Sequence, residues 1–245
     1  MKSLFFDLVC GASGDMILAS LLDLGASLEA LRRELGRTGI PGLELGVEKQ
    51  SRNGVLCSKL KLAWPQEASK GGYRHLEQIL GLIAEGRYCE RVACRCRAVL
   101  QRLAEAEAEV HGIAVEEVHF HEIGAVDTIV DILGSCLCLE HLEVERLCFS
   151  TLTVGTGTVR TAHGLLPLPA PATARLIRGY RVRQLDTGSE ILTPTGAALL
   201  TGLGSQEEAG LHGRVEGIGY ACGDKLIPGF SDFLRVFLIQ EQPEP

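Results

Sequence analysis

The chain has 245 residues, of which 46% are hydrophobic and 22% charged, and its formal net charge is -7. This composition is typical of a globular protein that buries a sizeable core and excludes a disordered chain. The negative charge argues against nonspecific nucleic-acid binding, which needs a basic face. A small anionic ligand stays compatible with it, because backbone N–H groups and metal ions hold phosphate locally.

The nine cysteines predict a reducing compartment, so we expect a cytoplasmic protein. Their number is odd and they form no Cys-x-x-Cys pair, which does not fit a disulfide scaffold. The apolar segment Leu4–Ala26 is interrupted by Asp7, Asp15 and Asp23, and therefore resembles neither a signal peptide nor a membrane anchor. We expect no membrane partner and no nucleic-acid partner.

Hydrophobic periodicity predicts a strand, two helices and a hairpin at the start of the chain. Ile17, Leu18 and Leu21 recur at helical intervals, and Asn53-Gly54 is a typical hairpin turn. The expected elements are a strand over Leu4–Val9, helices over Met16–Leu24 and Leu28–Leu35, and strands over Leu43–Lys49 and Val55–Ala63.

Helices dominate the middle of the chain and short strands the second half. We expect Leu166–Ala172 to be irregular, because proline cannot donate to a β-ladder or continue a helix. The predicted helices are His75–Ala84, Tyr88–His111, Ala125–Leu139, Ala172–Ile177 opened by Pro171, and Pro194–Leu203; the extended segments are Val118–Glu122, parts of Val144–Arg160, Tyr180–Gln184, Arg214–Tyr220 and Phe233–Ile239.

This alternation predicts an α/β fold, with one or more mixed sheets and interleaved helices. The polar loop around Ala68–Gly72 is the best candidate for a boundary between two lobes, residues 1–67 and 73–240, within a single region of 245 residues.

The segment from His119 to Asp131 carries the strongest functional signal. His119 and His121 share one face of an extended segment, whereas Asp127 and Asp131 are four apart on one helix face, and Glu122 lies between the two pairs. Imidazole with carboxylate suits first-row divalent metal ions. Alternatively, the helix dipole stabilises Asp127 in a first turn, and the histidines only hydrogen-bond the aspartates.

A second candidate site follows the first strand. The strand ends near Asp7, a candidate metal ligand, and the turn Gly11-Ala12-Ser13-Gly14-Asp15 leads into a helix. This is a common site geometry in α/β proteins, and the N–H groups of the turn can receive phosphate. Asp15 either binds a metal ion or caps the helix, and the spacing alone favours the cap.

Two later motifs add candidates. His163, before Gly164, is either a base, a metal ligand or a hydrogen-bonded loop residue. Thr193 and Thr195 can cap a helix that begins at Pro194, a start that explains them without a ligand. Glu190 is the functional candidate of that motif.

Taken together, the motifs resemble the LarC family, the nickel-insertion proteins of nickel-pincer nucleotide cofactor synthesis. In chain order, the resemblance rests on GASGDM from Gly11 to Met16, HFHEIGAVDTIVD from His119 to Asp131, AHG from Ala162 to Gly164, LPLPAPAT from Leu166 to Thr173, and TPTGAALL from Thr193 to Leu200. These motifs extend over most of the chain.

The resemblance implies an enzyme of the lyase class, which inserts nickel into pyridinium-3,5-bisthiocarboxylic acid mononucleotide and joins it to a ring carbon and two sulfurs. It further implies CTP with a divalent cation, Mg or Mn, and a product that serves lactate racemase. The implied catalytic candidates are Glu122, Asp127 and His163; the metal ligands are His119, His121, Asp127, Asp131 and Asp7; the residues for the anionic nucleotide are Gly11, Ser13, Gly14, Asp15, Thr193 and Thr195.

Two departures from the family pattern matter. Many members carry a histidine-rich stretch before Arg74, where this chain has Pro65–Gly72 without histidine. The family pattern also continues into a C-terminal domain associated with CTP, whereas this chain ends at Pro245. We therefore expect CTP use to need that domain or a longer partner chain, and a homo-oligomer is left open. The alternatives are a noncatalytic nickel-binding or scaffold module and a metal-dependent phosphohydrolase.

Overall fold

Strand β1 (Lys2–Asp7) is an inner strand of a mixed sheet, because other strands pair with both of its edges. Its apolar side chains are buried, and Leu4 and Phe6 have no exposed surface. A computed structural model describes residues 1–65, 75–120, 126–161, 163–207 and 210–241. Within these ranges the sheet has the order β2-β3-β10-β11-β1-β4-β9. The other strands are β2 (Glu44–Arg52), β3 (Val55–Ala63), β4 (Arg146–Phe149), β9 (Ser205–Gln206), β10 (Arg214–Cys222) and β11 (Phe233–Gln240).

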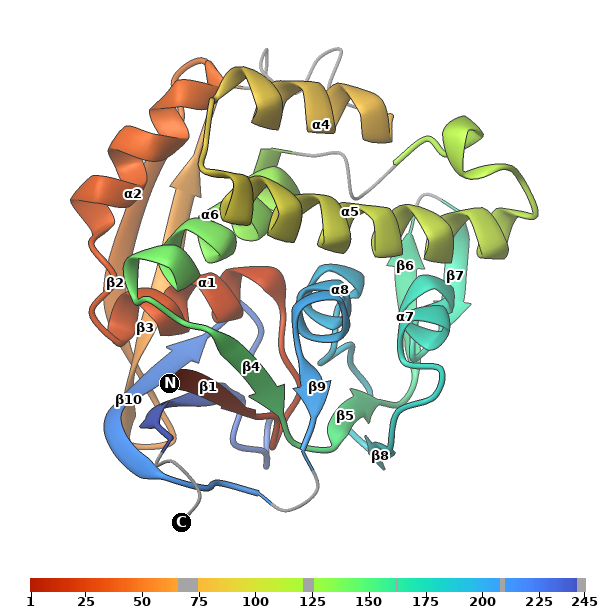
Figure 1. Ribbon diagram of the computed structural model, residues 1–245. Helices are drawn as coiled ribbons and strands as arrows, with labels where there is room; N and C mark the ends of the chain where they lie inside the picture. Colours follow the sequence, from red (N-terminus) through yellow and green to blue (C-terminus); the bar gives the residue numbers. More distant parts are fainter. Residues whose placement is uncertain (66–74, 121–125, 162, 208–209, 242–245) are drawn as a thin grey trace.

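The helices cover this sheet in layers (Figure 1). Helix α1 contacts β3 and β10 on one side and α6 on the other, and the long helix α5 crosses α6, α7 and α8. The helices are α1 (Gly14–Asp23), α2 (Leu28–Leu35), α4 (Leu76–Glu85), α5 (Glu90–His111), α6 (Val126–His141), α7 (Pro171–Leu176) and α8 (Pro194–Leu203), with the 3-10 turns η1 (Gly36–Thr38) and η2 (Val115–Glu117). The α/β class predicted from the sequence is therefore confirmed.

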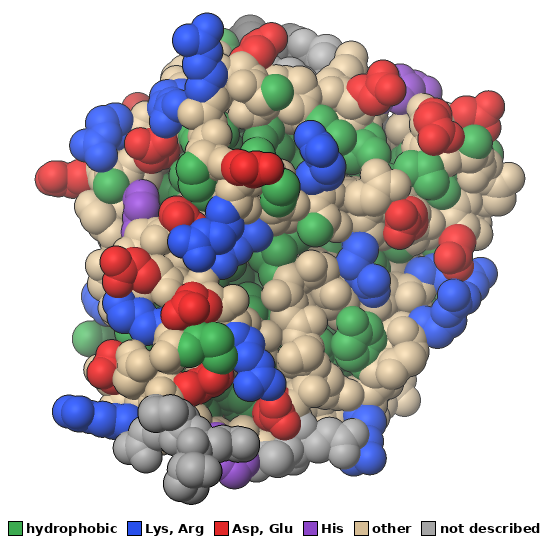
Figure 2. Space-filling model, in the orientation of Figure 1, with side chains coloured by type: hydrophobic (Ala, Val, Ile, Leu, Met, Phe, Trp, Pro, Cys, Tyr) green, Lys and Arg blue, Asp and Glu red, His purple; other side chains and the backbone are tan. Residues whose placement is uncertain are grey.

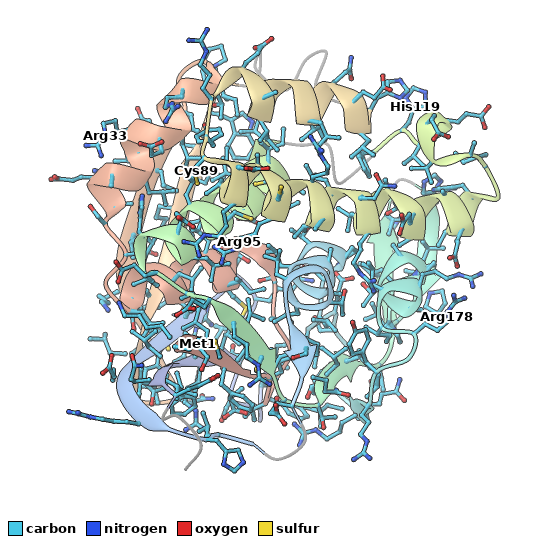
Figure 3. The ribbon with its side chains drawn as sticks, viewed as in Figure 1. Met1, Arg33, Cys89, Arg95, His119 and Arg178 are labelled. Atoms are coloured by element: carbon cyan, nitrogen blue, oxygen red, sulfur yellow. The ribbon has the colours of Figure 1, made fainter. Side chains whose placement is uncertain are left out.

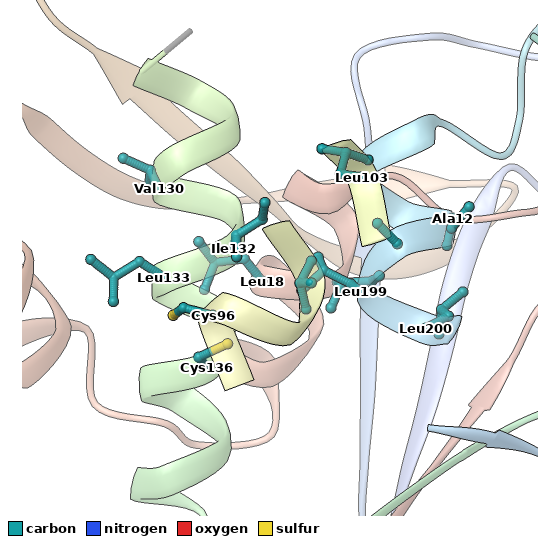
Figure 4. Packing of buried hydrophobic residues seen from close by; sticks show 14 of the residues in the cluster. Ala12, Leu18, Cys96, Leu103, Val130, Ile132, Leu133, Cys136, Leu199 and Leu200 are labelled. Atoms are coloured by element: carbon teal, nitrogen blue, oxygen red, sulfur yellow. The ribbon is translucent and has the colours of Figure 1, made fainter. Parts of the chain in front are cut away.

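The core lies between these helices. Leu18 of α1, Leu103 of α5 and Leu133 of α6 are fully buried, and Cys96 and Cys136 bring α5 and α6 together (Figure 4). All nine cysteines are free thiols. Seven of them are buried, as expected of small hydrophobic side chains, whereas Cys89 and Cys94 are exposed.

Local sequence signals place most elements correctly. Helix α2 has the predicted bounds, and the hairpin turn between β2 and β3 has Asn53 at φ 50° and Gly54 at φ 80°, as a tight two-residue turn requires. Thr193 caps α8 as predicted, since its side chain accepts a hydrogen bond from the backbone N–H of Gly196.

The prediction of an irregular Leu166–Ala172 is wrong at its start. Strand β7 (Gly164–Pro167) pairs with β6 (Thr158–Thr161) in a two-stranded ribbon and ends at Pro167. A proline is tolerated at the edge of such a ribbon, where its missing N–H is not needed. A second ribbon joins β5 (Leu152–Gly155) to β8 (Val182–Leu185).

The extended segment predicted at Val118–Glu122 is described only as far as Phe120. Val118 and Phe120 are buried and His119 is exposed, so the predicted alternation holds although these residues form no strand. His121 and Glu122 lie outside the described residues.

Strands β2 and β3 precede the proposed lobe boundary and share one sheet with strands that follow it. The division into lobes stays a prediction.

In the described part of the chain, every helix is too short or too polar to cross a membrane. Figure 2 shows one face of the molecule, on which lysine and arginine side chains are interspersed with aspartates and glutamates. Charge alone therefore does not mark this face as a binding surface.

Candidate functional site

Helix N-termini from distant parts of the sequence converge on one cavity of about 1040 Å³. The first residues of α1, α6, α7 and α8 all line it. A helix N-terminus carries a partial positive charge and unpaired N–H groups, so it stabilises carboxylates and anions nearby. The cavity therefore combines the polar N-termini of these helices with room for a ligand of nucleotide size.

The turn before α1 is fixed against the segment before α8. Gly11 has φ +75°, and a Cβ there would come within 2.0 Å of the carbonyl oxygen of Ile191. The backbone N–H of Thr193 donates to Ala12 O at 3.2 Å, and Gly196 also lies close to that oxygen. Glycine is thus needed for the close approach of the two segments, which brings the starts of α1 and α8 together.

Asp131 lies at the floor of the cavity. Its carboxylate lies beside Gly14, and its Oδ1 is buried without a hydrogen-bond partner among the described residues. Burial raises the pKa of Asp131 well above its ordinary value, and the nearby carboxylates of Asp15 and Asp127 raise it further. An orphaned buried carboxylate beside two others is costly unless a cation or a proton compensates it.

The other two carboxylates of this group stand in first helical turns. Asp15 accepts a hydrogen bond from the Ser13 hydroxyl, and burial raises its pKa despite that bond. Asp127 is exposed to the cavity, and its Oδ1 accepts from the backbone N–H of Thr128 at 2.8 Å. The predicted face of α6 is confirmed, since Val126, Ile129, Val130 and Leu133 are buried opposite these acids.

Among the residues that the structure describes, three histidines from different segments line the same cavity: His111, His119 and His163. The rings of His111 and His163 are 5.1 Å apart between centroids, and His111 Nε2 is 3.5 Å from a carboxylate oxygen of Glu107. His119 lies near one end of α4 (Figure 3). Its ring centroid is 4.0 Å from that of His75, the N-cap residue of α4. Imidazoles therefore gather in pairs around the cavity.

The structure brings most of the predicted site residues together, but not all of them. Asp7 lies outside the cavity lining, and its carboxylate forms an ion pair with Arg235. Gly11 contributes through the turn rather than through the lining. The predicted residues that line the cavity are Ser13, Gly14, Asp15, His119, Asp127, Asp131, His163, Thr193 and Thr195, and Glu190 joins them.

Local motifs did not identify several residues of the lining. The pair Glu107 and His111 has the i, i+4 spacing of one helix face, a signal that the run of glutamates in α5 obscured. The others come from β3 and from the segment after β10, whose approach depends on the sheet. The residues missed are Lys61, Trp64, Glu107, His111, Asp224, Lys225 and Asp232.

The charge of this lining suits a cation. Carboxylates far outnumber lysines, and the histidines add neutral ligands for a first-row metal ion. Within the described ranges, however, no three of these side chains are already close enough to hold a metal together. Binding of a metal ion would thus draw ligands inward or use donor atoms of a bound substrate.

Comparisons with known proteins agree with one another. The family model "Nickel insertion protein" matches residues 4–245. Two relatives whose names assign them to nickel insertion, from Dictyoglomus thermophilum and Pelobacter propionicus, are 40% and 43% identical to the chain over 97% and 98% of its length. A relative from Staphylococcus epidermidis, named pyridinium-3,5-bisthiocarboxylic acid mononucleotide nickel insertion protein, is 37% identical over 99% of the chain.

The matched region covers 61% of the first two relatives and 60% of the third, so the chain spans about three fifths of their length. No solved structure matches the chain.

Proposed function

The chain belongs to the nickel insertion protein family, and on this basis we propose that it inserts nickel into pyridinium-3,5-bisthiocarboxylic acid mononucleotide. The observation that carries the proposal is the gathering of Asp15, Asp127 and Asp131 with His119 and His163 around one cavity. A divalent cation relieves the mutual repulsion of these carboxylates and the cost of the buried Asp131 oxygen.

Nickel is the cargo of the proposed reaction. Its ligands on the protein are Asp131, Asp127 and His119, with His121 as the second histidine of that segment. The sequence also predicts Asp7 as a nickel ligand. Its carboxylate is paired with Arg235, so Asp7 is the least favourable of the predicted ligands. Mixed oxygen and nitrogen ligands bind nickel without holding it as tightly as thiolates hold soft metals, which favours onward transfer to the sulfur atoms of the substrate.

Forming a nickel–carbon bond requires that the ring carbon lose its proton. A general base must therefore stand within hydrogen-bond reach of that carbon. Asp127 and His163 both face the cavity, and Glu122 is the third candidate from the sequence. The Ser13–Asp15 turn with Thr193 and Thr195 borders the same space and would hold polar groups of the nucleotide.

The remaining parts of the reaction belong to the same proposal. CTP with Mg or Mn would be used by a C-terminal domain or partner that corresponds to the part of the relatives outside the matched region. The reaction would be that of a lyase, and its product would mature lactate racemase. A homo-oligomer is compatible with this scheme.

The proposal is tested by incubating the chain with the thiocarboxylated mononucleotide and nickel, and by measuring the nickel-containing product with mass spectrometry. The assay is run with and without CTP and the C-terminal part of a relative. Product that disappears with Asp131→Asn supports the proposal. Absence of product under every condition, although the parent binds both reactants, would contradict it.

A second candidate function is a noncatalytic nickel-binding module. It is favoured by the length of the chain, which spans about three fifths of the relatives that it matches. The same assay separates the two, because a binding module would load nickel stoichiometrically and give no product, even with the C-terminal part and CTP present.

A further inference from the structure

One wall of the cavity differs in charge from its floor. Among the described residues that line the cavity, Lys61 and Lys225 are the lysines, and no arginine accompanies them. The floor carries Asp15, Asp127 and Asp131. The wall also carries Asp224 and Asp232, but their charges are paired with Lys59 and Arg52. The cavity is thus divided into an acidic part, suited to a metal ion, and a part where an anion meets less repulsion.

The sheet places the two lysines on the same wall. Strand β10 pairs in parallel with β3 through Ala221 and Ser58, so the chain that leaves β10 continues beside β3. Lys59 of β3 then binds Asp224, with 2.6 Å between the ammonium nitrogen and the carboxylate oxygen. Lys225 follows Asp224 directly. The hydrogen bond from Lys59 lowers the pKa of Asp224, and the charge of the nearby Lys61 lowers it further.

Trp64 belongs to this wall as well. It follows β3, lines the cavity, and is half-buried because it packs against the core. It is the single tryptophan of the chain. An indole ring held in this way offers a rigid aromatic surface, and indole is the side chain that attracts organic cations most strongly.

A buried ion pair fixes the segment that carries Lys225. The guanidinium of Arg52 is 3.4 Å from the carboxylate of Asp232 and donates to the carbonyl oxygen of Gly223 at 2.7 Å. Asp232 also accepts from the backbone N–H of Ile227 at 3.1 Å. The segment is held at both ends and in its middle, which is the preorganisation expected of a binding wall.

We propose that this wall is the mononucleotide subsite: Lys61 and Lys225 bind the phosphate, and Trp64 stacks on the pyridinium ring. The inference rests on the proposed function, because it takes the substrate class from there. The three carboxylates of the floor repel a phosphate, so the lysines are the more favourable partners for it. The phosphate on the lysines and the ring on the indole then lie in the same cavity as the acidic floor, where the metal ion binds.

The phosphate competes with an existing contact. Lys61 forms an ion pair of 2.9 Å with Glu48, and both side chains are about half exposed. Exposed pairs of this kind contribute little to stability. A phosphate that binds both lysines therefore displaces Glu48 from Lys61 readily.

Tryptophan fluorescence tests the subsite without any metal. The probe is nicotinic acid mononucleotide, whose pyridinium ring accepts an electron from excited indole and quenches its emission. We expect saturable quenching in the parent chain and a weakening of about tenfold or more in Lys61→Ala/Lys225→Ala, because two charge-assisted contacts are lost. Trp64→Ala lacks the fluorophore, so its binding is measured by calorimetry. This substitution should weaken binding about three- to thirtyfold.

Controls separate the contributions. Nicotinamide riboside has the cationic ring without the phosphate, so its affinity should depend on Trp64 and not on the lysines. Lys2→Ala removes a lysine outside the cavity and should change neither affinity. Nickel affinity should be the same in the lysine variant as in the parent.

Nucleotide binding that ignores the two lysines and Trp64, and is weakened instead by Ser13→Ala with Thr195→Val, would place the phosphate at the helix turns and overturn the proposal. The nickel-insertion assay is read separately. A chain that binds the nucleotide through this wall and gives no product refutes the proposed function and leaves the subsite standing.

Discussion

Gly14 lies directly against the carboxylate of Asp131: a Cβ at Gly14 would come within 2.5 Å of Asp131 Oδ2 and within 2.8 Å of Thr195 Cγ2. The absence of a side chain at the start of α1 thus makes room for a buried carboxylate of α6. This contact joins two motifs that are more than a hundred residues apart in the sequence.

Gly14→Ala should displace the Asp131 carboxylate and lower nickel affinity by about tenfold or more, as supporting contacts of metal ligands commonly do. Overpacking should also destabilise the fold by about 1–3 kcal/mol. Nickel titration by calorimetry measures the first effect and urea unfolding the second.

The matched control is Gly81→Ala in helix α4, where a Cβ would meet no atom within 4 Å. It should stabilise the helix by about 0.5–1 kcal/mol and leave nickel affinity unchanged. Equal nickel affinity in the parent and Gly14→Ala would show that Asp131 does not take part in binding.

Asp131→Asn should make the chain more stable near neutral pH. The pKa of Asp131 is higher in the folded chain than in the unfolded chain. Its carboxyl therefore destabilises the fold increasingly as pH rises from the unfolded pKa of about 3.9 toward the folded pKa. Replacing this carboxyl group should therefore raise the free energy of unfolding by about 0.5–2 kcal/mol at pH 7 and by almost nothing at about pH 3. Urea unfolding at the two pH values measures the difference.

Asp127→Asn provides the contrast, because Asp127 is exposed and lies in the first turn of α6. Loss of its charge removes a favourable dipole interaction and should cost about 0.3–1 kcal/mol at pH 7. If Asp131→Asn destabilised the metal-free chain as Asp127→Asn does, other groups of the protein would already compensate the charge of the buried carboxylate.

Arg52→Ala should destabilise the chain strongly. Arg52 is 2% exposed, and its removal leaves the buried carboxylate of Asp232 without its cation. Loss of one partner of a buried pair costs about 3–5 kcal/mol. The double variant Arg52→Met/Asp232→Asn should recover much of that loss in urea unfolding, and a single variant within about 1 kcal/mol of the parent would rule out this account of the pair.

Thr193→Ala should cost about 1 kcal/mol of stability, since Thr193 Oγ1 accepts from the backbone N–H of Gly196 at 3.2 Å and caps α8. Thr193→Ser keeps the hydroxyl and should unfold at nearly the parent urea concentration. A loss in the serine variant as large as in the alanine variant would show that the methyl group matters instead of the cap.

The elements of this fold could largely be predicted from the sequence because their signals are local. The apolar spacing of α1, the Asn53-Gly54 turn and the Thr193 cap each act within a few residues. The order of strands in the sheet could not be predicted in this way. Strand β10 inserts between β3 and β11, a placement decided by packing between residues far apart in the chain.

The same division holds for the site. Asp127 and Asp131 could be placed on one face from their helical spacing, and the resemblance of the motifs pointed to Gly14 and His163. Trp64, Lys225 and Asp232 carry no local motif, because they reach the cavity only through the pairing of β3 with β10. Asp7 is the opposite case. Its place at the end of a strand predicts a metal ligand, but in the folded chain its carboxylate forms an ion pair with Arg235.

Nickel should bind at the floor of the cavity through Asp131 and its neighbours. A crystal of the chain soaked with nickel and measured at the nickel absorption edge tests it most directly. We predict an anomalous peak in the cavity, within coordination distance of the Asp131 carboxylate and a histidine of the lining. A nickel ion bound only outside the cavity, for example at the surface residues His141 or His212, would contradict the claim.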